Sequence, residues 1–294
     1  MRKIISIKVL NYFIVNAFLL YQRFKTNLNR RVSRNFSKIT SSGISLTFSD
    51  QGVGPPLLLL HGITQDASAF GPLIRHLKSR FKIIALDCRG HGDSDKPKLI
   101  KDYGRSMVDD VENLLAQLKI EKVHLLGTSM GAEIALRFAA YNASSILSLT
   151  VIGSGLSGEK ESDNYTAVGE ALKSHHSFGP WIKATGGIGY FSPDAIGIAT
   201  ADSMLRGQDI DALSSVFLGM PEIVNLTDNE ISALTMPVLG ICGELDEERP
   251  ALERMIGKIP NFSFKLIANR GHMDLDQDPN YFNIIEAFLT EHRQ

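Results

Sequence analysis

The sequence contains little cysteine: Cys88 and Cys242 are the two cysteines among 294 residues. Two thiols build neither a disulfide framework nor a cysteine-based zinc site. Both lie at the ends of predicted strands, so we expect small buried apolar side chains. The histidine spacings are not typical of metal ligands, and we predict no metal and no cofactor. A G-x-x-x-x-G-K-[ST] loop and a strand-linked G-x-G-x-x-G motif are also missing, which argues against phosphate-loop and dinucleotide binding.

Acidic residues are missing from residues 1–49, which hold nine basic residues. Of the 31 basic and 32 acidic residues in the chain, this leaves 22 basic and all 32 acidic residues for the remainder. An acidic body binds nucleic acid poorly, so we expect no nucleic-acid partner. With 44% hydrophobic and 21% charged residues, the composition is typical of a globular protein and excludes disordered and fibrous classes.

Residues 4–21 are mostly apolar, interrupted by Lys8 and two asparagines. An 18-residue helix spans about 27 Å, close to the thickness of a bilayer core. More positive charge follows this segment than precedes it, which favours a membrane anchor with the body on the cytoplasmic side. A secretory signal, an organellar targeting segment cleaved near residues 34–37, and a packed helix on a soluble cytoplasmic protein stay open. We predict that residues 1–38 form a separate segment whose removal leaves activity intact.

From residue 44 onward, short apolar runs alternate with segments of helical periodicity. Strands are predicted at 44–48, 57–60, 83–86, 123–126, 146–152, 238–242 and 262–267. Helices are predicted at 67–78, 107–118, 132–141 and 281–289. This alternation predicts an α/β fold with a doubly wound, mostly parallel sheet. Residues 155–230 break the pattern and are predicted to be a helical insertion into a core formed by residues 39–154 and 231–294.

The segment Gly127-Thr128-Ser129-Met130-Gly131 fits the pattern G-x-S-x-G, between a predicted strand and a predicted helix. In this motif the turn is so tight that the serine backbone is strained, and glycines two residues away on either side avoid clashes. The N-terminus of the following helix favours negative charge that develops nearby. The motif therefore predicts Ser129 as a nucleophile; the alternative is a chance match in which Ser129 only caps the helix.

Five motifs follow one another in a fixed order: HGIT at 61–64, DCRGHGDSDKP at 87–97, GTSMG at 127–131, GELD at 243–246 and RGHMD at 270–274. Together they resemble the α/β-hydrolase superfamily over about residues 44–290, in particular its small serine esterases, perhydrolases and carbon–carbon bond hydrolases. The resemblance implies that the insertion is a helical cap. Related dehalogenases and epoxide hydrolases have aspartate at the nucleophile position, so a serine there argues against those activities.

The resemblance places the catalytic base at His272, in a Gly-His loop after the last predicted strand. The chain order of this fold, Ser then Asp then His, places the acid at Asp246, after strand 238–242. Some relatives carry the acid after the strand that corresponds to 146–152, but Gly-Ser-Gly stands there in this chain. With His272 as the base, activity should rise through a pKa of about 6–7, the usual range for histidine.

An acyl-transfer site also needs donors for the oxyanion and a pocket for the substrate. The resemblance assigns the oxyanion donors to the backbone N–H groups of Ile63 and Met130, which leaves both side chains free to line the pocket. His61 belongs to a motif that shapes a loop near the site. Pocket residues are predicted at His61, Phe178, Trp181 and Phe217.

These features predict a serine hydrolase that cleaves a small-to-medium carboxylic ester through an acyl-enzyme. One alternative is a carbon–carbon bond hydrolase that uses the same three residues on a diketone-type substrate. Another is a non-catalytic protein of the same fold that binds a small ligand. In each case the expected partner is a small molecule.

Overall fold

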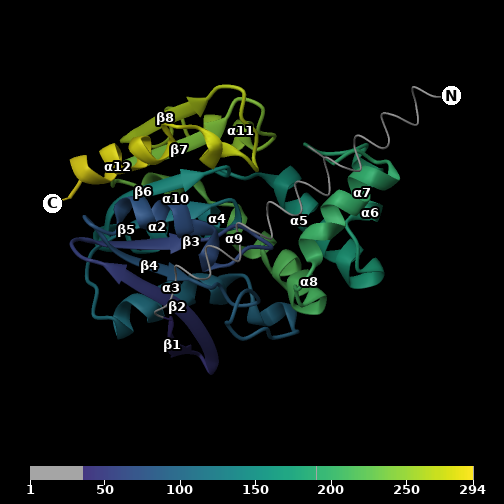
Figure 1. Cartoon of the computed structure of the whole chain (residues 1–294), viewed down its shortest axis with the longest axis horizontal. Helices are drawn as coiled ribbons and strands as arrows, with labels where there is room; N and C mark the ends of the chain where they lie inside the picture. Colours follow the sequence, from purple (N-terminus) through teal and green to yellow (C-terminus); the bar gives the residue numbers. More distant parts are fainter. Residues whose placement is uncertain (1–35, 190, 294) are drawn as a thin grey trace.

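The computed structural model describes residues 36–189 and 191–293. One eight-stranded sheet crosses the molecule in the order β1-β2-β4-β3-β5-β6-β7-β8 (Figure 1). The strands are β1 (Phe36–Ser41), β2 (Ile44–Gly52), β3 (Pro56–Leu60), β4 (Lys82–Leu86), β5 (Val123–Thr128), β6 (Ile146–Ile152), β7 (Val238–Gly243) and β8 (Phe262–Ile267). Strands β3 to β8 pair in parallel, whereas β1 and β2 pair antiparallel at one edge. The predicted doubly wound, mostly parallel fold is confirmed.

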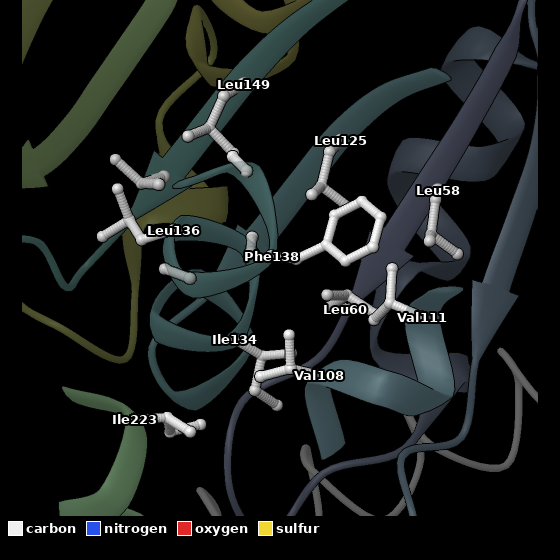
Figure 2. Packing of buried hydrophobic residues seen from close by; sticks show 14 of the residues in the cluster. Leu58, Leu60, Val108, Val111, Leu125, Ile134, Leu136, Phe138, Leu149 and Ile223 are labelled. Atoms are coloured by element: carbon white, nitrogen blue, oxygen red, sulfur yellow. The ribbon is translucent and has the colours of Figure 1, made fainter. Parts of the chain in front are cut away.

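Two helical layers cover the sheet. The layer that packs on one face includes α3 (Arg105–Gln117), α4 (Met130–Tyr141), α9 (Pro221–Val224) and α11 (Arg249–Glu253). The opposite face is covered by the 3₁₀ turn η1 (Ala67–Phe70), α2 (Gly71–Leu77) and α12 (Tyr281–Glu291). Figure 2 shows Leu58, Leu60 and Phe138 packed together in the first layer.

The central strand β3 shows why continuous apolar runs occur in this sequence. Leu58 and Leu60 point into one core, and Leu57 and Leu59 point into the other; all four side chains are fully buried. Successive side chains of a strand face opposite sides of the sheet, so a strand covered on both sides needs apolar residues at every position. The predicted run at 57–60 is therefore a central strand.

Residues 159–224 form a cap, whose last helix, α9, also packs on the first face of the sheet. It contains α5 (Glu159–His175), α6 (Gly179–Thr185), α7 (Ala195–Asp202), α8 (Ile210–Gly219) and α9. Figure 1 shows α5 to α8 gathered on the side of the body opposite the C-terminus. The cap has an apolar cluster of its own, which includes Leu172, Phe178, Leu213 and Phe217. The short helix α10 (Asp228–Ser232) crosses the predicted end of the insertion at residue 230.

The N-terminal boundary differs from the predicted one. Strand β1 was not predicted from the sequence, and the division between residues 38 and 39 falls inside it. β1 and β2 form a hairpin around Ser42 and Gly43, which both have positive φ, as a two-residue turn of type I′ requires. The predicted anchor at residues 4–21 lies outside the described residues. Within the described ranges, no helix has the length and apolar character needed to cross a membrane.

Candidate active site

Ser129 lies on the sharp turn between β5 and α4. Its backbone has φ 51° and ψ −120°, and its N–H donates to the carbonyl oxygen of Ile152 at 2.8 Å. A Cβ on Gly127 would lie 2.1 Å from the carbonyl oxygen of Gly131, and a Cβ on Gly131 would lie 2.1 Å from that of Leu60. Both glycines are therefore required by close backbone approach, as the G-x-S-x-G pattern predicts. The turn presents the Ser129 side chain to a cavity at the carboxyl ends of the strands.

His272 and Asp246 lie side by side, although 26 residues separate them along the chain. His272 Nδ1 is 3.1 Å from both carboxylate oxygens of Asp246. The backbone N–H of Glu248 donates to Asp246 Oδ1 at 2.9 Å and helps to hold the buried carboxylate in place. With its Nδ1–H donated to Asp246, the neutral imidazole keeps Nε2 as a proton acceptor.

A glycine makes room for this imidazole ring. Gly153 follows β6 with φ 63°, and a Cβ at this position would lie 3.0 Å from His272 Cε1 and 3.5 Å from Asp246 Oδ2. In some related sequences the acid follows the strand that corresponds to β6, where this chain has Gly153-Ser154-Gly155. A Cβ at position 153 would make a tight contact with the imidazole, and the segment carries no carboxylate, which supports Asp246 as the partner of His272.

The surroundings of His272 favour its charged form. Burial lowers the pKa of His272, but the hydrogen bond and charge of Asp246, together with the negative charges of Glu247 and Glu248, raise it to about 9. This value lies above the pKa of about 6–7 expected from the sequence. The base form of His272 is therefore populated at alkaline pH.

Ser129 and His272 line the same cavity, which has a volume of about 890 Å³. Three of the predicted pocket residues, Phe178, Trp181 and Phe217, line it from the cap. Phe178 and Phe217 pack edge to face with ring centroids 6.2 Å apart, so they also belong to the core of the cap. The cavity lies between the cap and the sheet.

The fourth predicted pocket residue, His61, does not line the cavity. Its ring is fully buried, Nε2 accepts a hydrogen bond from the backbone N–H of Cys88 at 3.0 Å, and Nδ1 lies 2.8 Å from the Gly62 carbonyl oxygen. Nε2 therefore ties this loop to the loop after β4, while Nδ1 interacts within its own loop. The loop-shaping interpretation of His61 thus agrees with the structure, and its assignment to the pocket was wrong.

The two expected oxyanion donors differ in their side chains. Ile63 lines the cavity, whereas the Met130 side chain is fully buried in the apolar core between the sheet and its first helical layer. Among the backbone hydrogen bonds that the described residues make outside helices and strands, neither the Ile63 nor the Met130 N–H is a donor. Gln65 stabilises the loop after β3 that carries Ile63, because its Oε1 accepts a hydrogen bond from the Gly62 N–H at 3.1 Å.

A buried carboxylate beside the nucleophile was not predicted from the sequence. Glu133, one turn into α4, is 3% exposed and lines the cavity. Its carboxylate accepts hydrogen bonds from Ser157 Oγ at 2.8 Å, from Ser154 Oγ at 3.2 Å and from the Tyr165 hydroxyl of α5. Burial raises the pKa of Glu133 to about 7 against the effect of these donors. The available sequence signal was a glutamate in the first turn of a mostly apolar helix, directly after the nucleophile motif.

Metal ligation finds no support in the described part of the chain. No cluster of three or more histidine, cysteine or carboxylate side chains there could hold a metal ion. Cys88 and Cys242 are both buried free thiols.

Comparison with known proteins agrees with this geometry. The family model of the alpha/beta hydrolase fold matches residues 55–202, just over half of the chain. The chain belongs to the alpha/beta hydrolase fold family. A Bacillus subtilis protein named as putative 2-succinyl-6-hydroxy-2,4-cyclohexadiene-1-carboxylate synthase is 27% identical over 274 residues, which cover 85% of this chain and 96% of that protein. Several other curated relatives match over only about 29–38% of their own length.

Two solved structures of the same fold cover nearly all of this alpha/beta hydrolase. A thermophilic esterase from Thermogutta terrifontis has a TM-score of 0.71 and 25% identity, covering 88% of this chain and 100% of its own. A structure described as a membrane phospholipase A has a TM-score of 0.70 and 21% identity, covering 100% of both chains. Hydrolases such as this esterase are among the proteins that share the alpha/beta hydrolase fold with this chain.

Proposed function

We propose that this alpha/beta hydrolase cleaves small-to-medium carboxylic esters through an acyl-enzyme on Ser129. The observation that supports this most is the convergence of three groups from distant parts of the chain. Ser129 and His272 line one cavity, and His272 Nδ1 is 3.1 Å from both Asp246 oxygens. This is the combination of nucleophile, base and orienting acid that acyl transfer requires.

In the proposed reaction, Ser129 Oγ attacks the ester carbonyl carbon while His272 Nε2 takes the hydroxyl proton. Asp246 holds the Nδ1–H and stabilises the imidazolium that forms. The negative oxygen of the tetrahedral intermediate is stabilised by the N–H groups of Ile63 and Met130. The intermediate collapses, the carbon–oxygen bond of the ester breaks, and the alcohol leaves with the proton from His272. A water molecule, deprotonated by His272, then attacks the acyl carbon. The bond between this carbon and Ser129 Oγ breaks, the carboxylic acid leaves, and His272 returns the proton to Ser129.

The test is hydrolysis of p-nitrophenyl esters of increasing acyl length by the full chain in non-ionic detergent, compared with Ser129→Ala. Turnover that depends on Ser129 supports the proposal, and the length profile measures the pocket. Labelling of Ser129 by a fluorophosphonate without ester turnover would favour the carbon–carbon bond hydrolase. A folded protein with neither turnover nor labelling would favour a ligand-binding role and refute the proposal.

We also propose that residues 4–21 anchor the chain in a membrane with the body on the cytoplasmic side. The proposal is supported by the apolar run and by the basic residues that follow it. Alkaline carbonate extraction of membranes and protease protection of spheroplasts test it. Release by carbonate would refute the anchor, and digestion of the body from outside would refute the orientation.

A further inference from the structure

The wall of the cavity carries an excess of acidic side chains. Among the described residues, its basic lining consists of Arg206 and His272. Arg206 is exposed, so it lies where water reaches it and screens its charge. The acidic lining residues are Asp66, Glu133, Glu161, Glu247, Glu248 and Asp276.

Not all of these carboxylates contribute equally. Glu161 accepts a hydrogen bond from the guanidinium of Arg254 at 2.6 Å, so its charge is balanced within the protein. Glu133 is hydrogen-bonded to hydroxyl groups, which stabilise a carboxylate without supplying positive charge. Glu247 and Glu248 follow Asp246 directly and act on His272 as negative charges.

The excess lies next to the reacting groups. Glu133 is four residues after Ser129 on α4, and Glu248 donates its backbone N–H to the Asp246 carboxylate. A protonated His272 offsets one negative charge, but this proton is absent from the form that attacks an ester. A carboxylate on the substrate would enter a partly buried space lined by like charges, where repulsion is poorly screened.

We infer that the cavity selects esters whose acyl chains are uncharged or cationic and rejects acyl chains that carry a carboxylate. The inference rests on the proposed ester hydrolysis and narrows its substrate class. It separates this chain from its Bacillus subtilis relative, whose name specifies a carboxylate-bearing compound. Among the described residues that line the cavity, the one arginine, Arg206, is exposed, so none of them offers a buried guanidinium to pair with such a group.

The experiment compares three p-nitrophenyl esters of matched length, which differ at the far end of the acyl chain. In methyl adipate this end is an uncharged methyl ester, in free adipate it is a carboxylate, and in 6-(trimethylammonio)hexanoate it is a cationic trimethylammonium group. Release of p-nitrophenolate is measured at about pH 8.5, where ordinary carboxylates are ionised. Ratios of kcat/KM between esters are compared, since changes in the reactivity of His272 affect all three esters alike. We expect the wild-type protein to favour methyl adipate over free adipate by about 30-fold or more, and to accept the cationic ester at least as well as the neutral one.

Glu248→Gln and Glu133→Gln remove one charge each while keeping the side-chain shape. We expect each to reduce the discrimination against free adipate by about fivefold. Glu112→Gln, which removes an exposed charge on α3, is the matched control and should leave the ratio unchanged. A wild-type ratio near one, or a ratio that neither cavity variant changes, would overturn the inference.

Failure of the proposed function gives a different result. If none of the esters turns over in a Ser129-dependent way, ester hydrolysis itself is refuted. The charge preference is then read from the rates at which a neutral and an anionic alkyl fluorophosphonate label Ser129. Equal labelling rates would overturn it, and faster labelling by the neutral compound that Glu248→Gln reduces would support it.

Discussion

The pH dependence of activity follows from the groups around His272. The imidazole must be neutral to accept the Ser129 proton, so activity is low below its pKa and rises as the pH passes through it. The structure raises this pKa to about 9, with the hydrogen bond to Asp246 and the charges of Glu247 and Glu248 outweighing burial. At that value about 1% of the free enzyme holds the neutral base at pH 7. The plateau of kcat/KM should therefore lie about 100-fold above its value at pH 7.

The contribution of the two glutamates can be measured separately. Removing a nearby negative charge lowers the pKa of a histidine, and one unit corresponds to about 1.4 kcal/mol, a typical interaction between partly buried charges. Glu248→Gln should thus move the rise in activity down by about one pH unit. Glu247 is exposed, so Glu247→Gln should give a smaller shift that disappears at high salt.

The assay is kcat/KM for an uncharged p-nitrophenyl ester between about pH 5.5 and 10, corrected for spontaneous hydrolysis, because this parameter reports the free enzyme. Burial raises the pKa of Glu248 to about 7, so its carboxylate is ionised in the range where His272 titrates. Glu112→Gln, at an exposed position of α3, serves as the charge control. A midpoint at or below pH 6.5 in the wild type, or identical midpoints in wild type and Glu248→Gln, would refute the reasoning.

Three further perturbations test other parts of the structure. Ile63→Pro removes an oxyanion N–H and should lower kcat by about 10²–10³, whereas Ile63→Val should retain most activity; equal rates for the two would exclude this N–H from the site. Gly153→Ala places a Cβ 3.0 Å from His272 Cε1 in a backbone with φ 63°, so it should lower kcat far more than it changes KM; an unchanged kcat would contradict that placement. The buried side chains of Arg89 and Asp110 form an ion pair with two hydrogen bonds of 2.6 and 2.5 Å. Arg89→Met leaves the Asp110 carboxylate buried without this partner, so it should reduce the free energy of unfolding, measured by urea titration, by about 3–5 kcal/mol. A loss below about 1 kcal/mol would show that the pair is dispensable.

A further prediction concerns strand β1 and the N-terminal boundary of the folded body. A chain that begins at residue 39 loses half of the β1 pairing with β2, while a chain that begins at residue 36 keeps it. The shorter chain should have the lower thermal unfolding midpoint, measured by circular dichroism. Equal midpoints would show that the first half of β1 adds no stability.

Much of the fold was predictable because its signals are local. The run at 57–60 needs an apolar side chain at every position to satisfy two cores, and the limits of the strand at 146–152 were predicted as the structure has them. The turn at Ser129 could be located from its two glycines, which are needed because neighbouring backbone atoms leave no room for a Cβ at either position. Strand β1 escaped prediction because it is a mostly exposed edge strand, defined by its pairing with β2 instead of by an apolar pattern.

The sequence by itself determined the order of strands β2 to β8 and of the main core helices, the position of the nucleophile turn and the residues able to act with it, since each depends on residue type and short spacing. Only the tertiary structure decided which of these groups meet. His61 lies outside the cavity because both of its ring nitrogens interact with backbone groups of the protein. Glu133 lines the cavity, where it accepts hydrogen bonds from side chains 21 to 32 residues away along the chain. The raised pKa of His272 has the same origin, because electrostatic interactions depend on distance and burial in the folded protein and not on separation along the chain.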